Sequence, residues 1–158
     1  MLPNQLLLNT YLGRAIGEIC PNHYANDADN HSAHFVSHAM GYGWGVTCLT
    51  LRGGPRRGSG FGANIRVPEI LTHCPTVGTW ASKPVTMMSC LVFVTGVSSV
   101  DLSNKMMDNV PQKHVGIYLS GLIYHYSNAQ HRVIYETAEQ FSHYYPAPDN
   151  AMFYGSLP

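Results

Sequence analysis

The stretch that decides the fold is residues 114–127, "HVGIYLSGLIYHYS". Two runs rich in β-branched, aliphatic and aromatic residues flank a Ser-Gly pair at residues 120–121, and this pattern predicts a β-hairpin with a two-residue turn. Residues placed symmetrically about such a turn become neighbours, so His114 is expected close to His125. The hairpin therefore predicts that the two histidine rings share a face and touch.

Outward from the hairpin, the second half of the chain keeps a strand-like pattern and the first half has a helical one. Further strands are expected over residues 90–97, 131–137 and 151–156. Helices are expected over residues 4–19, from Asn30 or His31 to Gly41, and over 67–73, with loops at 21–30 and 41–62. This order predicts a single α+β domain over residues 1–158, in which N-terminal helices pack on one face of a central antiparallel sheet.

Composition excludes several classes of function. The chain has 158 residues, 45% hydrophobic and 11% charged, so a folded domain with a real core is expected. Its formal net charge is zero, and its only basic cluster, "RGGPRR" at residues 52–57, is interpreted as a solvated loop, so no nucleic-acid partner is expected. No apolar run approaches the ~20 residues of a membrane span. The first residues lack the features of a signal peptide, which predicts synthesis in the cytoplasm without one.

The thiols and imidazoles leave a metal site open as one alternative. The four cysteines contain no C-x-x-C pair, and we expect reduced, buried thiols or at most one disulfide: Cys20, Cys48, Cys74 and Cys90. His34 and His38 lie four residues apart on the second helix, so both could face one ion. The first of them is not followed by the Glu of a zinc peptidase, and no third ligand is evident. We therefore expect no metal and no cofactor.

Ser32, in "DNHSAHFV" at residues 29–36, has two further interpretations. A serine at a helix start is commonly a capping residue without a catalytic role. A nucleophile is also well placed there, because the helix N-terminus stabilises an oxyanion and a strand histidine can act as base. The residues alone leave both interpretations open.

Taken together, these segments resemble the NlpC-type, papain-like cell-wall peptidases. The family's "D-C-S-G-F-V" nucleophile motif is similar to residues 29–36, its "G-D-L-V-F-F" strand to residues 89–94, and its "H-V-G-I-Y-L-G" strand to residues 114–120. The resemblance implies an NlpC-type fold, Ser32 at the nucleophile position, His114 as general base and His125 as the orienting third residue. It also implies an oxyanion site at the Ser32 amide, with Tyr24 as the candidate for an upstream tyrosine.

Two departures from the family pattern shape the expected activity. The 82-residue gap between Ser32 and His114 predicts an insertion within about residues 45–85. Serine stands where the family has cysteine, and a hydroxyl keeps its proton where a thiol loses it, so little activity is expected of the chain as written. We interpret Ser32 as a Cys→Ser change that silences the enzyme; a natural serine variant or inactive homologue are the alternatives.

The resemblance further implies a substrate and a place of action. The expected substrate is the peptide stem of peptidoglycan, cut between D-glutamate and the diamino acid, with the N-acetylmuramoyl–L-alanine amide as the alternative bond. A small catalytic domain without a signal peptide resembles an antibacterial toxin delivered by a type VI-like secretion system. Such a toxin would act in the periplasm of the target cell, and its producer would need a cognate immunity protein. A non-catalytic or metal-binding module of the same fold is the remaining alternative.

Overall fold

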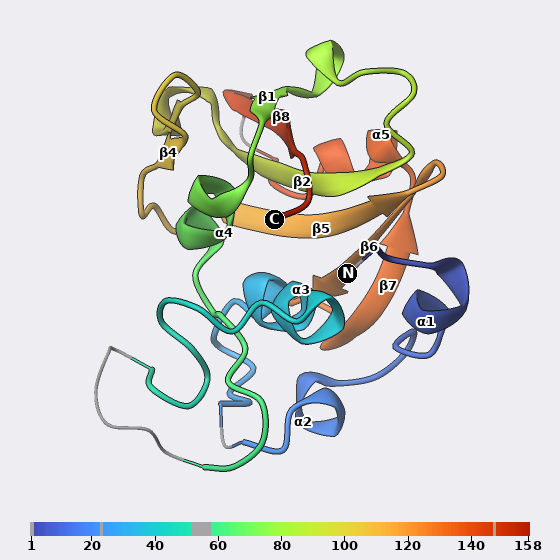
Figure 1. Ribbon diagram of the computed structural model, residues 1–158, viewed down its shortest axis with the longest axis vertical. Coiled ribbons are helices and arrows are strands. Elements are labelled where there is room, and N and C mark those ends of the chain that lie inside the picture. Colours follow the sequence, from blue (N-terminus) through green and yellow to red (C-terminus); the bar gives the residue numbers. More distant parts are fainter. Residues whose placement is uncertain (1, 23, 52–57, 147) are drawn as a thin grey trace.

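A six-stranded antiparallel sheet organises the molecule, with strands in the order β1-β8-β2-β5-β6-β7 (Figure 1). The computed structural model describes residues 2–22, 24–51, 58–146 and 148–158. The strands are β1 Val77–Thr79, β2 Ser89–Gly96, β5 Lys113–Leu119, β6 Leu122–Ser127, β7 Arg132–Glu136 and β8 Asn150–Gly155; β3 Val100–Asp101 and β4 Met106–Met107 form a separate pair. The predicted α+β class and antiparallel sheet are confirmed.

The hairpin of β5 and β6 forms as its sequence predicts. Ser120 and Gly121 both have positive φ, 49° and 96°, which is the backbone of a two-residue turn matched to the twist of the strands. Leu119 pairs with Leu122 across the turn. Further along β5, a Cβ on Gly116 would lie only 2.7 Å from the side chain of Ile123, so a glycine lets the two strands cross closely there.

Two of the predicted helices have the expected bounds and pack on one face of the sheet. They are α3 Ser32–Met40, which ends at Gly41 with a φ of 78°, and α4 Val67–His73, which has Pro68 in its first turn. Their buried side chains join those of β2 and β5 in the main core: Phe35, Val36, Ile70, Leu71, Leu91, Phe93, Val115 and Ile117. The face that α3 covers is thus set by every second residue of β2 and β5.

The opposite face of the sheet is also covered, which corrects the expectation that helices lie on one face only. A short helix, α5 Ala138–Ser142, places Phe141 against Val92, Val94 and Ile123 in a second buried cluster. Thr137 begins this helix with a capping box shared with Gln140. Five residues are too few to leave a clear 3.6-residue pattern, and for that reason the sequence did not predict α5.

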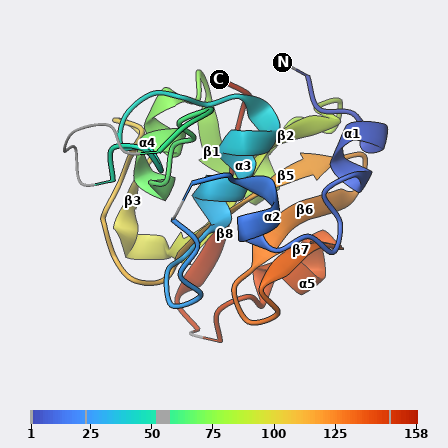
Figure 2. The ribbon, with the colours of Figure 1, turned by 90° about the horizontal axis from the view of Figure 1, so that it is seen from below.

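The single helix expected over residues 4–19 is wrong. Two short helices stand there, α1 Gln5–Asn9 and α2 Ile16–Ile19, and both lie beside the β6–β7 end of the sheet (Figure 2). Between them Gly13 adopts a φ of 80°, and its N–H donates to the Val133 carbonyl at 2.9 Å. The Val133 N–H donates in turn to Arg14 O at 3.0 Å. A backbone that pairs with β7 in this way cannot continue an α-helix, so tertiary contact overrides the amphipathic pattern.

The remaining connections complete the sheet in an order that sequence proximity does not predict. The last strand, β8, inserts between β1 and β2 instead of extending the β5-β6-β7 meander. Single-turn 3-10 helices stand at Trp80–Ser82 and Val97–Ser99. The basic loop predicted at residues 52–57 lies outside the described residues. Within the described ranges, no helix has the length and apolar character needed to cross a membrane.

Candidate active site

The centre of the candidate site is a pair of histidines on the hairpin whose rings meet edge to face. His114 Nε2 lies 2.9 Å from His125 Nδ1, and the two rings meet at 85°. Both side chains are fully buried. The contact that the hairpin register predicts is therefore present, and each ring uses one nitrogen for it.

A carboxylate that the sequence analysis missed extends the pair. His125 Nε2 lies 3.4 Å from Glu136 Oε2, a separation typical of an ion pair and too long for a well-aligned hydrogen bond. In the β6–β7 register His125 faces Ile134, so Glu136, two residues further, shares its face. The predicted strand at 131–137 contains Glu136, but only its register with β6 shows that Glu136 lies diagonally across from His125.

The carboxylate determines how protons are arranged along the chain His114–His125–Glu136. An ionised carboxylate only accepts, so it favours a proton on the facing Nε2 of His125. The Nδ1 of His125 is then an acceptor and takes its hydrogen bond from the Nε2–H of His114. This leaves the lone pair on His114 Nδ1, an atom that is buried and has no hydrogen-bond partner among the described residues. His114 therefore presents a free basic nitrogen.

Burial keeps His114 neutral. Loss of solvation, followed by the nearby His125 ring, lowers the pKa of His114 well below its ordinary value of 6.5. Tyr144 stacks on the His114 ring with centroids 3.8 Å apart and planes at 15°, and Tyr145 meets the same ring edge-on. At neutral pH the ring is thus an uncharged imidazole that can accept a proton, shielded from water by two tyrosines.

Ser32 is the first residue of α3 and is fully buried. Its hydroxyl oxygen has no hydrogen-bond partner in the described part of the chain. Its amide, however, donates to Asn30 Oδ1 at 2.9 Å, so the oxyanion role expected for that amide is already occupied by a cap. Helix geometry leaves the next amides, of Ala33 and His34, without an intrahelical acceptor, and these are the donors that the helix start offers.

A network of amide side chains connects the start of α3 to the end of the sheet where β5 begins. Asn30 Nδ2 donates to the Lys113 carbonyl at 2.7 Å, and Asn128 Nδ2 donates to Asn30 Oδ1 at 3.1 Å. Asn128 Nδ2 also donates to the Tyr144 hydroxyl at 3.2 Å, which links the network to the ring that covers His114. Ser32 and His114 are therefore brought to one end of the sheet.

The two residues nevertheless approach that end from different sides. Val115 and Ile117 face α3, so alternation along β5 places His114 on the face of α5, in contact with Phe141. Ser32 Oγ makes no hydrogen bond with His114 among the described contacts. The structure thus joins His114, His125 and Glu136 directly, and joins Ser32 to them through Asn30 and the Lys113 backbone.

Tyr24 lies beside the first turn of α3. Its ring centroid is 5.1 Å from that of His31 and 5.3 Å from that of His34. The side chain is partly buried, and burial raises the pKa of its hydroxyl. The structure therefore places Tyr24 next to the helix that carries Ser32, where its packing partners are two histidines.

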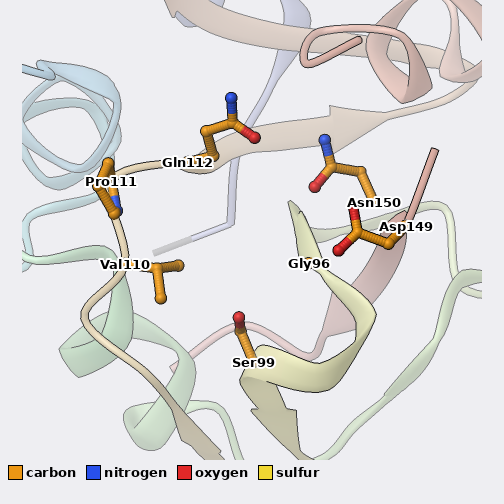
Figure 3. A pocket seen from close by; sticks show the side chains of 7 residues that line it. All are labelled: Gly96, Ser99, Val110, Pro111, Gln112, Asp149 and Asn150. Atoms are coloured by element: carbon orange, nitrogen blue, oxygen red, sulfur yellow. The ribbon is translucent and has the colours of Figure 1, made fainter. Parts of the chain in front are cut away.

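A pocket of about 370 Å³ opens at the same end of the sheet. Gly96 at the end of β2, Gln112 just before β5, and Asn150 at the start of β8 line it (Figure 3). Gln112 is two residues from His114, but neither His114 nor Ser32 lines this pocket. The cavity lies at this end of the sheet and does not reach the buried pair His114 and His125.

A second group of chemically reactive side chains gathers beside α3. The ligand atoms of four residues all lie within 4.8 Å of one another: Cys20, His34, His38 and Cys48. The sequence predicts His34 and His38 on one helix but gives no sign that two of the cysteines join them. Cys20 lies 14 residues before His34, and Cys48 lies 10 residues after His38. Only the folded chain brings them to one point.

Comparison with known proteins adds no relative to this description: no family model, no curated protein and no solved structure matches the chain.

Proposed function

We propose that the chain is a hydrolase of amide bonds with the papain-like, NlpC-type mechanism, in which position 32 holds the nucleophile and His114 is the general base. The observation that carries the proposal is the chain His114–His125–Glu136, in which both imidazoles are buried and a lone pair is left on His114 Nδ1. A neutral imidazole oriented by a second group and a carboxylate is the arrangement that general-base catalysis needs. A merely structural histidine pair gains nothing from a free, buried ring nitrogen, which costs free energy.

The reaction is an acyl transfer in two halves. The nucleophile at position 32 attacks the amide carbon while its proton moves to His114 Nδ1, and the free amides at the start of α3 stabilise the oxyanion. His114 then gives the proton to the leaving amine as the C–N bond breaks. Water then attacks the acyl-enzyme while its proton moves to His114 Nδ1. As the bond between the acyl group and the nucleophile breaks, His114 returns this proton to the nucleophile.

Two parts of the site must move for this reaction. Proton transfer requires the nucleophile and His114 Nδ1 to come within about 3 Å, and such contacts often tighten only when substrate binds. Tyr144, stacked on His114, and Asn30, bonded to the Lys113 carbonyl, hold the two sides in their present positions. The His114 ring is buried and the Asn30 bond is partly buried, so both contacts must open before position 32 and His114 can meet.

We propose the peptide stem of peptidoglycan as the substrate, with the bond between D-glutamate and the diamino acid as the target. The resemblance of residues 29–36, 89–94 and 114–127 to the NlpC-type peptidases supports this choice. For a chain with this activity we propose the role of an antibacterial toxin that acts in the target periplasm, is delivered by a type VI-like secretion system and is neutralised by an immunity protein. The muramoyl–L-alanine amide is the alternative bond, since both are amides that one acyl-transfer site would cleave.

The test compares Ser32→Cys with the unmodified chain and with Ser32→Cys/His114→Gln on purified peptidoglycan, with products identified by mass spectrometry. We expect muropeptide cleavage by Ser32→Cys only. Glutamine keeps a donor toward His125 but has no basic nitrogen, so the double variant controls for the base. If Ser32→Cys is folded and releases no product from peptidoglycan or defined muropeptides, the proposal is wrong. Periplasmic expression of Ser32→Cys should lyse cells, whereas cytosolic expression should leave them intact.

A further inference from the structure

The four residues that converge on α3 have the donor set of a metal site. Cys20 directly follows α2. His34 and His38 lie one turn apart on α3, and Cys48 lies in the loop after α3. Three of the side chains are buried and His38 is partly so. Two thiols and two imidazoles within 4.8 Å of one another are the Cys₂His₂ ligand set that Zn²⁺ takes in closed, tetrahedral sites.

The distance between the two sulfurs fits this geometry. Cys20 Sγ and Cys48 Sγ are 3.7 Å apart. Two thiolates on one tetrahedral Zn²⁺, each at ~2.3 Å, lie roughly 3.8 Å from one another. A disulfide needs sulfurs at ~2.05 Å, and both cysteines are free thiols here. The separation therefore fits two thiolates on a shared ion and is too long for a disulfide bond.

The histidines present their lone pairs to the same point. His31 Nε2 lies 2.7 Å from the carbonyl of Asn26, which only accepts, so this nitrogen carries the proton. His31 Nδ1 is then an acceptor for the Nδ1–H of His34, 3.1 Å away. His34 Nε2 is left as a lone pair, and it is buried without a partner among the described residues, as is Nε2 of His38. A ring whose other nitrogen is held in this way is typical of a metal ligand.

A donor outside the four-residue set also contacts Cys48. Asn22 Nδ2 donates to Cys48 Sγ at 3.3 Å, as outer-shell groups do to a metal-bound sulfur. The Cys48 sulfur is thus held from outside the ligand set as well.

We propose that Cys20, His34, His38 and Cys48 bind one Zn²⁺ in a structural, tetrahedral site. The ion displaces the thiol protons of Cys20 and Cys48, and these two protons leave to solvent. Four protein ligands close the coordination shell, so no position remains for water or substrate and the ion takes no part in catalysis.

The site has a clear structural purpose. Cys20, Cys48, Leu49 and Ala63 form a small cluster that is separate from the main core. So little apolar burial holds a loop weakly, and small cores of this kind are commonly stapled by a metal or a disulfide. The ion would fasten residues 20 and 48 to α3, and the proposal holds whether or not position 32 is catalytic.

The experiment measures metal in the full chain purified under reducing conditions, by elemental analysis and by titration of the metal-free protein with Co²⁺. We expect one zinc per chain and, with Co²⁺, the visible bands of a tetrahedral ion together with thiolate charge transfer. Chelation should lower the melting temperature. Cys48→Ser should weaken zinc binding by more than about 100-fold. Cys74→Ser is the matched control, because Cys74 is buried elsewhere and its thiol only donates to the Ile70 carbonyl.

Three results would overturn the proposal. The first is a folded, reduced chain that takes up no zinc or Co²⁺. The second is a Co²⁺ spectrum without thiolate charge transfer, which would place the ion on other ligands. The third is a Cys20–Cys48 disulfide, detected by mass spectrometry of the alkylated chain without reduction. The wild-type spectrum decides the ligand set even if Cys48→Ser fails to fold.

Discussion

Acid should destabilise the protein through His114, and the replacement His114→Gln should remove that part of the effect. In the folded chain burial lowers the pKa of His114 well below 6.5, while in the unfolded chain the ring titrates normally. As the pH falls through 6.5, His114 binds a proton in the unfolded state but not in the folded state. Stability is therefore lost on acidification and is fully present above the unfolded pKa.

The structure sets the size of the effect. The ring is fully buried, and the groups that face it are His125, Tyr144 and Tyr145, none of which supplies a negative charge at acid pH. In the limit that His114 stays neutral in the folded state, one histidine contributes a loss of about 2 kcal/mol between pH 8 and pH 5. Glutamine preserves a donor toward His125 and does not titrate, so this contribution disappears.

The assay is urea unfolding at pH 8, 7, 6 and 5, followed by the fluorescence of Trp44 and Trp80 and run at constant metal content. His31 and His34, whose pKa values burial also lowers, contribute equally to both proteins, so only the difference between the two pH profiles counts. His143→Gln, at an exposed position, is the control and should follow the wild type. Parallel losses of stability in wild type and His114→Gln would show that the folded state protonates His114 readily and would refute the reasoning.

Three further outcomes follow from named contacts. In the Ser32→Cys background, Glu136→Gln should lower kcat/KM at least roughly 10-fold with little change in melting temperature, because an amide no longer favours a proton on the facing imidazole; equal rates in a peptidase assay would argue against the carboxylate. Gly116→Ala should cost about 1–3 kcal/mol in urea unfolding, since its Cβ would lie 2.7 Å from the neighbouring strand's side chain, whereas Gly17→Ala, with 3.8 Å of room, should not destabilise. Tyr144→Phe keeps the stacked ring but loses the hydroxyl that accepts from the partly buried Asn128 amide, so a loss of about 1 kcal/mol is expected and an unchanged unfolding midpoint would contradict it.

The hairpin shows which parts of this fold are predictable from sequence. Its period-two pattern and Ser-Gly turn determine the register, and the register alone brings His114 to His125. The predicted strand ends fall within one residue of β2, β7 and β8, because apolar runs bounded by Gly, Asn and charged residues leave little choice. Such local signals account for strands β2, β5, β6, β7 and β8 and for α3 and α4. They predict neither β1 nor the place of β8 in the sheet.

The features that the sequence did not predict depend on contacts between distant segments. The N-terminal pattern would suit one helix, but Gly13 and Arg14 pair with Val133 of β7 and break it. Glu136 belongs to the site only through the β6–β7 register, and Cys20 and Cys48 meet His34 only after the loop folds back on α3. No pattern within a window of the sequence carries these relations, since each is decided by how the elements pack.

The helix α3 connects the two sites that these distant contacts create. Its first residue, Ser32, is the proposed nucleophile position, and His34 and His38 follow on its first and second turns. His31, just before the helix, bonds by its backbone to Asn128 and by its ring to His34. The sheet thus holds the start of the helix through Asn30 and Asn128, and the four-ligand cluster holds the side of the helix to the following loop. A nucleophile must be held to within a fraction of an ångström of its base, and that precision requires a rigid support. A closed metal site one turn from Ser32 would supply such a support without taking part in the reaction.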